Sequence, residues 1–269
     1  MPSQFFENHT VIITGASSGI GREMALQLAD QGARLVLAAR QADKLVELSM
    51  ICRSRGGQAL AVPTDVSDPK QCQSLIEMTV KTYGAIDMLV NNAGITMWAK
   101  FDEITDLTIF EKLMKVNYLG SVYCTYFALP YLKQSQGRIL AVSSLTGKGG
   151  VPTRTGYAAT KHAMAGFFDS LRVELKETGV SVTVVYPGFV DTGVQARGFG
   201  ADGMPLGVNP LQVDKVMTAA ECARSSLWAA AERKREEVMT LRGKLGQWIK
   251  LIAPGLVDKI ASQAIEQGK

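Results

Sequence analysis

The stretch Val11-Ile12-Ile13-Thr14-Gly15-Ala16-Ser17-Ser18-Gly19-Ile20-Gly21 carries the strongest indication of a fold class in this sequence. A short β-branched run leads directly into glycines spaced G-x-x-x-G-x-G, and a segment of helical period follows them. Such glycines permit a tight turn and let the backbone approach a phosphate, while the helix N-terminus offers free N–H groups to the anion. The stretch therefore predicts a strand, a phosphate-binding turn and a helix. A turn with a purely structural role is the alternative.

Beyond this stretch, short apolar runs alternate with segments of helical period. Strands are predicted over residues 10–14, 34–39, 58–63, 86–91, 138–143, 180–186 and 237–241. Helices are predicted over residues 19–31, 43–55, 68–83, 104–132, 155–178 and 218–234, the last of which opens with the capping box Thr218-x-x-Glu221. Strands that are apolar on both faces need helices on both faces. We therefore expect an α/β fold, a Rossmann-type doubly wound parallel sheet of seven strands, in a single domain over residues 1–269.

Two segments break the alternation. Residues 192–212 are rich in glycine, and long loops of this kind are often lids over a site. The tail, residues 242–269, is apolar around Trp248, and its basic residues include Arg242, Lys244, Lys250 and Lys259. Such a tail either lies in a membrane interface or packs over the substrate cleft or a partner subunit. We favour the second interpretation, because exposed apolar patches commonly mark interfaces.

Composition narrows the classes of function. The 269 residues hold 29 Lys and Arg against 25 Asp and Glu, and the net charge of +4 forms no basic stripe, so no nucleic-acid partner is expected. Four cysteines without a C-x-x-C pair are expected to be buried thiols in a reducing compartment. Two isolated histidines predict no metal site. Because neither a signal peptide nor a bilayer-length apolar stretch is present, we expect a cytoplasmic protein without a transmembrane segment.

The residue after the second predicted strand indicates the cofactor. In dinucleotide-binding folds, an acidic residue about 20 positions beyond the glycine turn binds the 2′-hydroxyl of NAD. This chain has Arg40 there and no carboxylate. A guanidinium is permanently charged and can bind a 2′-phosphate through two hydrogen bonds, so NADP(H) is the predicted cofactor. The alternative is that Arg40 only solvates the end of a strand.

Tyr157 and Lys161 stand four residues apart in a predicted helix and therefore share one face. A nearby ammonium favours the phenolate and lowers the pKa of tyrosine from about 10 toward the working pH, as general acid–base catalysis requires. Ser144 follows a predicted strand at the sheet edge where ligands bind, and its hydroxyl could hydrogen-bond a carbonyl oxygen. By itself, a Tyr-x-x-x-Lys pair is more often a chance pattern.

In combination, these features resemble a short-chain dehydrogenase/reductase of the classical type. The matching residues span most of the chain in the expected order: Thr14, Gly15, Gly19, Ile20, Gly21, Asp65, Val66, Asn91, Asn92, Ala93, Gly94, Asn117, Ser144, Tyr157, Lys161, Pro187 and Gly188. The resemblance implies that Tyr157 is the acid–base group and that Lys161 lowers its pKa and holds the nicotinamide ribose. It also implies that Ser144 orients the carbonyl, and that Asn117 holds a water that links Lys161 to solvent.

The same resemblance implies a cofactor site. Its members would be Gly15, Ser17, Ser18, Gly19, Ile20, Gly21, Arg40, Asp65, Val66, Asn91, Ala93, Gly94, Tyr157, Lys161, Pro187, Gly188, Val190 and Thr192. Residues 65–66 would contact the adenine, residues 91–94 the adenine ribose, and residues 187–192 the nicotinamide. The family's second marker for NADP, a basic residue before Gly19, is absent because Ser18 stands there. The cofactor prediction therefore depends mainly on Arg40.

The substrate is argued from the residues expected around the nicotinamide, since a fold does not specify it. Ser144, Leu145, Tyr157 and Phe189 are predicted to contact the substrate, and Met97, Trp98 and Val151 to extend a mostly apolar lining. We expect reversible reduction of a bulky or lipid-like ketone. The alternatives are a 3-oxoacyl-thioester reductase and a catalytically silent NADP(H)-binding sensor. Relatives pair through helices that correspond to residues 104–132 and 155–178, which implies a homodimer or homotetramer.

Overall fold

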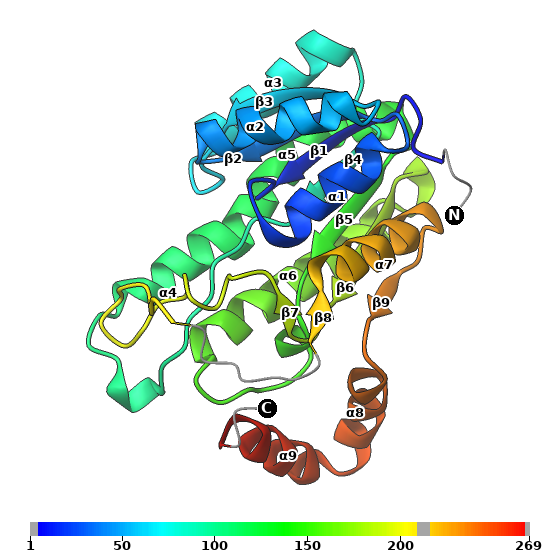
Figure 1. The fold of residues 1–269 in the computed structure, drawn as a ribbon. Coiled ribbons are helices and arrows are strands. Elements are labelled where there is room, and N and C mark those ends of the chain that lie inside the picture. Colours follow the sequence, from blue (N-terminus) through cyan, green and yellow to red (C-terminus); the bar gives the residue numbers. More distant parts are fainter. Residues whose placement is uncertain (1–4, 209–215, 267–269) are drawn as a thin grey trace.

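The computed structural model describes residues 5–208 and 216–266 of the chain. Seven parallel strands form one sheet in the order β3-β2-β1-β4-β5-β6-β9 (Figure 1). Their bounds are Thr10–Thr14 (β1), Arg34–Ala39 (β2), Gln58–Pro63 (β3), Met88–Asn91 (β4), Arg138–Val142 (β5), Ser181–Tyr186 (β6) and Glu236–Val238 (β9). The predicted fold class is confirmed: a doubly wound parallel sheet in one domain.

The strand order places the region where a ligand would bind. The chain runs from β1 outward through β2 to β3 and then returns to β4 on the other side of β1. In open α/β sheets, ligands bind beyond the carboxyl ends of the strands at such a reversal. We therefore expect a ligand site at the loops that follow β1 and β4.

Helices cover both faces of the sheet because each central strand is apolar on both. Val11 and Ile13 of β1 pack with helices α1 (Gly19–Ala29), α2 (Ala42–Ser54) and α7 (Ala219–Ala231). Ile12 points to the opposite face, toward α3 (Pro69–Tyr83), α5 (Gly120–Gln134) and α6 (Thr155–Glu174). Burial of each such side chain contributes about 1.5–3 kcal/mol, so this alternation of faces holds the two helical layers on the sheet.

The predicted helix over residues 104–132 is interrupted in the structure. Its segments are α4 (Thr108–Leu113), a π-helical turn (Met114–Leu119) and α5, with a 3₁₀ turn, Phe101–Glu103, before them. A π turn carries an extra residue and often marks a functional position. Here it contains Asn117, whose side chain hydrogen-bonds both backbone groups of Ile95. That long-range contact is the physical reason why the regular helical period is broken.

The predicted helix over 155–178 ends early, at Glu174, and a 3₁₀ turn, Lys176–Thr178, follows.

The glycine-rich loop begins as predicted, although residues 209–212 of the expected span lie outside the described residues. Two short strands, Val190–Asp191 (β7) and Met217–Thr218 (β8), pair at its ends and were not predicted. Within the loop, Phe199 exchanges backbone hydrogen bonds with Thr96 and Trp98. The predicted capping box of α7 is present, since Thr218 and Glu221 hydrogen-bond each other's backbone N–H groups.

The tail forms two helices, α8 (Leu241–Ile252) and α9 (Pro254–Glu266), and residues 267–269 lie outside the described part. The two helices extend away from the sheet below β9 (Figure 1). α8 touches the body of the protein at both ends. Near its start Gly243 approaches Leu145, and in its last turn the Lys250 ammonium donates to the Lys148 carbonyl over 2.8 Å. Its apolar side chains are otherwise exposed: Trp248 by 71% and Ile252 by 87%. Within residues 5–208 and 216–266, no helix is both long and apolar enough to cross a bilayer.

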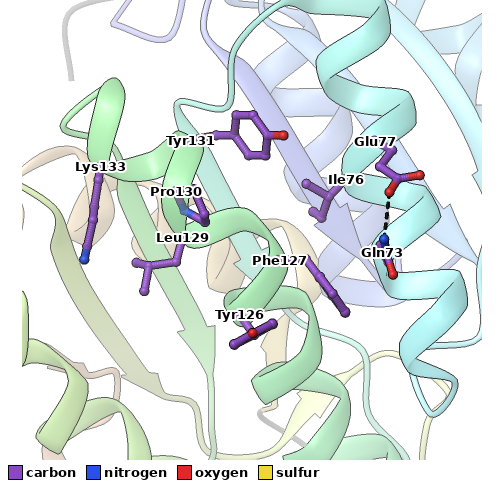
Figure 2. A pocket seen from close by; sticks show the side chains of 9 residues that line it. All are labelled: Gln73, Ile76, Glu77, Tyr126, Phe127, Leu129, Pro130, Tyr131 and Lys133. Carbon is purple, nitrogen blue, oxygen red and sulfur yellow. Dashed lines mark hydrogen bonds between the residues drawn. The ribbon is translucent and has the colours of Figure 1, made fainter.

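An open groove lies between α3 and α5 (Figure 2). It is lined by Gln73, Ile76, Glu77, Tyr126, Phe127, Leu129, Pro130, Tyr131 and Lys133. None of the residues that the sequence singled out for a site belongs to this lining. The groove is therefore a feature of the helical layer and not of the candidate site.

Candidate active site

The turn between β1 and α1 is shaped to receive a phosphate. A Cβ atom at Gly21 would lie 2.5 Å from the Gly15 carbonyl oxygen, and Gly15 itself adopts a φ of +66°. These positions therefore accept only glycine without strain. Ser18 stands at the N-cap of α1, but its side chain caps no backbone N–H. The first N–H groups of α1 are thus available to an anion, and the cradle fits the phosphates of a dinucleotide.

Hydrogen bonds of Thr14 and Asn92 join the ends of β1 and β4 and hold this turn. The sequence analysis did not include these two residues in the predicted site. The Thr14 hydroxyl donates to the Val90 carbonyl over 3.0 Å and accepts from the N–H groups of Asn92 and Ala93. The Asn92 amide donates in turn to the Thr14 carbonyl over 2.9 Å. Both residues stand in the motifs that carry the family resemblance, which was the available signal.

The predicted adenine-side residues lie around the ends of β2, β3 and β4. Arg40 is exposed directly after β2, and the Ala16 N–H donates to the Ala38 carbonyl, which ties the glycine turn to the same strand end. The Asp65 carboxylate accepts hydrogen bonds from the Ser67 N–H and hydroxyl. The Arg40 side chain is free at this edge, since it is exposed and forms no hydrogen bond or ion pair with another described residue.

Two other predicted cofactor residues are engaged with the helical layer. The Asn91 side chain is buried and donates to the Thr125 hydroxyl of α5 over 3.0 Å. Val66 is also buried, and a Cβ atom at Gly120 would lie 2.8 Å from its side chain. These contacts leave Ala93 and Gly94 as the more open members of the loop after β4.

Ser144, Tyr157 and Lys161 come together at the end of β5. Ser144 precedes a 3₁₀ turn, Leu145–Gly147, that packs closely against α6. A Cβ atom at Gly147 would lie 2.9 Å from the Lys161 carbonyl oxygen, so glycine permits this approach. The Ser144 hydroxyl lies close enough to the phenol of Tyr157 to influence its pKa. Sequence spacing predicted the pairing of Tyr157 with Lys161, and the fold adds Ser144 from a different element.

The electrostatics of this group differ from the expectation. Burial raises the pKa of Tyr157, and Arg154 and the nearby Ser144 hydroxyl oppose that rise only in part. Burial also lowers the pKa of Lys161 to about 8. The Lys161 ammonium donates to the Val142 carbonyl over 2.9 Å and lies 5.7 Å from the centroid of the Tyr157 ring. The expected lowering of the tyrosine pKa by Lys161 is thus not met in this structure, because burial outweighs the opposing effects of Arg154 and Ser144.

Asn117 connects the loop after β4 to α6. Its side-chain oxygen accepts from the Ile95 N–H over 2.8 Å. Its amide nitrogen donates to the Ile95 carbonyl over 2.9 Å and to the Thr160 hydroxyl over 3.0 Å. Because Thr160 precedes Lys161 on α6, these bonds fix the position of the loop relative to the Tyr157 group.

The loop after β6 lies where the resemblance places the nicotinamide. The Leu145 N–H donates to the Pro187 carbonyl, and a Cβ atom at Gly19 would lie 2.9 Å from the Thr192 side chain. Residues 187–192 thus lie between the Ser144 turn and the glycine turn of β1. The two aromatic rings predicted to line this region, Trp98 and Phe189, are 6.4 Å apart.

Two features of the predicted lining need correction. Met97 is fully buried in a small core with Ile109 and Leu113, and therefore cannot line an open cleft. Conversely, sequence reasoning missed Arg154, whose guanidinium lies 3.7 Å from the centroid of the Trp98 ring. The lining that was expected to be apolar thus contains a buried cation. Its place one helical turn before Tyr157 was the only signal in the sequence.

Comparisons with known proteins agree with this geometry. A family described as "short chain dehydrogenase" matches residues 9–200. A Dictyostelium discoideum protein named dehydrogenase/reductase SDR family protein 7-like is 34% identical over 99% of this chain and 86% of its own. An Arabidopsis thaliana protein named 11-beta-hydroxysteroid dehydrogenase-like 4A is 36% identical over 95% of this chain and 84% of its own. A short-chain dehydrogenase/reductase from Burkholderia phymatum, solved in complex with NAD, shares the fold with a TM-score of 0.82 and 23% identity, over 93% of this chain and 95% of that one.

Proposed function

The chain belongs to the short-chain dehydrogenase family of oxidoreductases, and we propose that it reversibly reduces a ketone with NADP(H). The observation that carries the proposal is the meeting of Ser144 and Tyr157 beside a phosphate cradle, with Lys161 on the same helix. The bound nicotinamide would supply or accept the hydride at the carbonyl carbon. The protein must then supply or accept the proton at the carbonyl oxygen, which is the task of a buried phenol.

Each residue of the group has a separate task in this proposal. The Tyr157 hydroxyl donates its proton to the carbonyl oxygen during reduction and recovers it during oxidation. The Ser144 hydroxyl hydrogen-bonds the same oxygen and stabilises the charge that develops there. Lys161, which now donates to the Val142 carbonyl, would hold the nicotinamide ribose, and Asn117 would hold a water that connects Lys161 to solvent.

NADP(H) is proposed over NAD(H) because Arg40 stands where a carboxylate would bind the ribose of NAD. Its side chain is exposed at the end of β2, next to the glycine turn. A 2′-phosphate would give this guanidinium a doubly hydrogen-bonded partner. The relative from Burkholderia phymatum was solved with NAD, but at 23% identity it supports the fold and not the choice of cofactor.

A bulky, mostly apolar ketone is the proposed substrate. Trp98, Leu145, Val151 and Phe189 are all half-buried around the Tyr157 group, so apolar surface is available to a ligand. Curated relatives are named for 11-beta-hydroxysteroids, which fits a rigid apolar substrate.

The direct test is oxidation of NADPH and NADH against a panel of ketones. The panel contains steroids, acylated dihydroxyacetone phosphate, 3-oxoacyl thioesters and small polar carbonyls. Turnover of the bulky apolar members with NADPH is the expected result. Preference for 3-oxoacyl thioesters would favour the thioester reductase instead. Cofactor binding without turnover of any member would favour a sensor, and turnover of only small polar carbonyls would contradict the substrate proposal.

The sequence favoured packing of the tail over the cleft or a partner subunit, but α8 leaves a row of apolar side chains exposed. We therefore propose instead that the tail contacts an anionic lipid surface, which would bring the site to apolar substrates. Leu241, Leu245, Trp248 and Ile252 recur at helical spacing on α8, and more than half of each side chain is exposed. The same helix carries Arg242, Lys244 and Lys250 and no acidic residue. An exposed apolar face with flanking cations is typical of helices that lie in a membrane interface.

Flotation with vesicles tests this contact. We expect the protein to float with vesicles that contain anionic lipid and to float less with neutral vesicles. The variant Trp248→Glu should remain at the bottom of the gradient, because it places a charge in the apolar face. Met50→Glu, at an exposed apolar position on α2, is the matched control and should float like the wild type. If the wild type stays at the bottom with anionic vesicles, the tail covers another partner.

We also propose that the protein is a homodimer or homotetramer that associates through α5 and α6, as the family resemblance implied. Tyr126 of α5 and Val173 of α6 are large apolar side chains exposed by 71% and 70%. Tyr126 also lines the groove of Figure 2. Light scattering should give the mass of two or four chains. Tyr126→Arg places a charge on the exposed face of α5 and should shift the measured mass toward that of one chain. A monomeric wild type would contradict this assembly.

The proposed compartment is the cytoplasm, in line with the expected reducing environment. All four cysteines are buried free thiols. Although Cys72 and Cys124 have sulfur atoms 3.6 Å apart, they form no disulfide.

A further inference from the structure

Arg154 is the most unusual charged residue in the structure. It stands at the N-cap of α6, and only 5% of its surface is exposed. One Nη atom donates to the Thr96 hydroxyl over 2.7 Å, and the guanidinium stacks on the Trp98 ring at 3.7 Å. These two contacts hold the side chain in one place. They leave the Nε and the second Nη buried without a hydrogen-bond partner.

No carboxylate balances this charge. Arg154 makes no ion pair with any described residue, whereas the other buried cation of the site, Lys161, donates to a backbone carbonyl. Burial lowers the pKa of Arg154 to about 10, which leaves the guanidinium charged at neutral pH. A buried charge without a partner costs free energy unless another interaction compensates for it. The structure therefore points to an anion that forms nearby during function.

Tyr157 is the group that can become that anion. It follows Arg154 by one helical turn, and the guanidinium carbon lies 5.8 Å from the centroid of its ring. A nearby opposite charge favours the charged form of a titratable group, and Arg154 acts on the phenol in that direction.

The other surroundings of Tyr157 supply little further charge. α6 also contributes Lys161, and the turn after β5 contributes the Ser144 hydroxyl. α4 and the loops after β4 and β6 contribute apolar or aromatic side chains, among them Leu113 and Phe199. Arg154 and Lys161 are thus the only charged groups that face the ring among the described residues.

We propose that Arg154 is a positioning residue that stabilises the phenolate of Tyr157, and that it works beside Lys161. The proposal rests on the proposed acid–base role of Tyr157. When the phenol gives up its proton, the phenolate and the guanidinium form a buried pair of opposite charges, so the cost of burying Arg154 is offset. Such a pair would favour the phenolate. In agreement, Arg154 lowers the pKa of Tyr157 and so opposes the rise that burial causes.

The test is a titration of Tyr157 by the ultraviolet absorbance of its phenolate. The chain has seven tyrosines, so the spectrum of a Tyr157→Phe partner is subtracted in every background. Arg154→Met and Arg154→Gln remove the charge, and two neutral variants are used in case one does not fold. Arg154→Lys keeps the charge. The titration is made with and without saturating NADP+, and it needs no substrate, so it remains informative even if no ketone in the panel is reduced.

We expect the pKa of Tyr157 to rise by about 1 unit or more in both neutral variants. In Arg154→Lys, it should return toward the wild-type value. Because the protonated phenol is the acid in reduction, activity is lost as pH rises through this pKa, and the alkaline limb of kcat/KM should move upward by the same amount. Arg172→Met removes another arginine of α6 far along the helix, and it should leave the titration unchanged.

An unchanged pKa of Tyr157 in both neutral variants would overturn the proposal. So would a loss of catalytic efficiency that comes wholly from KM with an unchanged pH profile, because that result would assign Arg154 to substrate binding.

Discussion

Replacement of Tyr157 by phenylalanine is expected to lower kcat by about 10²–10⁴-fold, the contribution that a positioned general acid typically makes. The change removes a single oxygen atom and leaves the ring in its apolar surroundings beside Leu113 and Phe199. The fold and the phosphate cradle should therefore be retained. Stopped-flow or steady-state oxidation of NADPH with the best ketone of the panel measures the effect.

Tyr126→Phe is the matched control for this variant. It removes the same hydroxyl from a tyrosine on α5 that is exposed and lies outside the site. Its kcat should equal that of the wild type, and both variants should bind NADPH in a fluorescence titration. Near-normal turnover by Tyr157→Phe would mean that another group protonates the carbonyl oxygen, and the proposed roles would have to be reassigned.

Replacement of Arg40 by aspartate is expected to reverse the cofactor preference. Loss of a charged hydrogen-bond partner costs about 1.5–3 kcal/mol, which corresponds to roughly a 10- to 100-fold weaker affinity for NADPH. The new carboxylate also repels a 2′-phosphate and offers an acceptor to a 2′-hydroxyl, so NADH should bind more tightly than to the wild type. Dissociation constants for both cofactors give the result directly and need no substrate.

Arg224→Asp provides the control for the change in net charge, because Arg224 is exposed on α7 outside the candidate site. It should leave the ratio of the two affinities unchanged. If Arg40→Asp keeps the wild-type ratio, then Arg40 does not contact the cofactor and the proposal for NADP(H) loses its main support.

Local patterns in the sequence were sufficient for the architecture. Apolar runs placed the strands of the main sheet, and the spacing of glycines before a helical period placed the turn between β1 and α1. These predictions succeed because a strand that is apolar on both faces can be buried in few ways, and because a Cβ atom at Gly21 would collide with the turn. The pairing of Tyr157 with Lys161 followed from helical geometry in the same manner.

Contacts between distant segments could not be predicted in this way. The π turn at Asn117 exists because its side chain bonds Ile95, and the fixed position of Arg154 depends on Thr96, which is 58 residues earlier. The direction of the Lys161 ammonium depends on the Val142 carbonyl of β5. Periodicity describes which face a residue occupies, but it carries no information about which group from another element will meet it there.

The sequence alone therefore determined a doubly wound sheet, a glycine turn between β1 and α1, and a Tyr–Lys pair on one helical face, since each depends on neighbours within a few turns of chain. The tertiary structure buried Met97 away from the cleft and placed the guanidinium of Arg154 against Trp98. It also brought Ser144, which the sequence had singled out on a separate element, close to Tyr157. The burial of Met97 and the place of Arg154 depend on packing and desolvation between segments far apart in the sequence, which is why no local pattern predicted them.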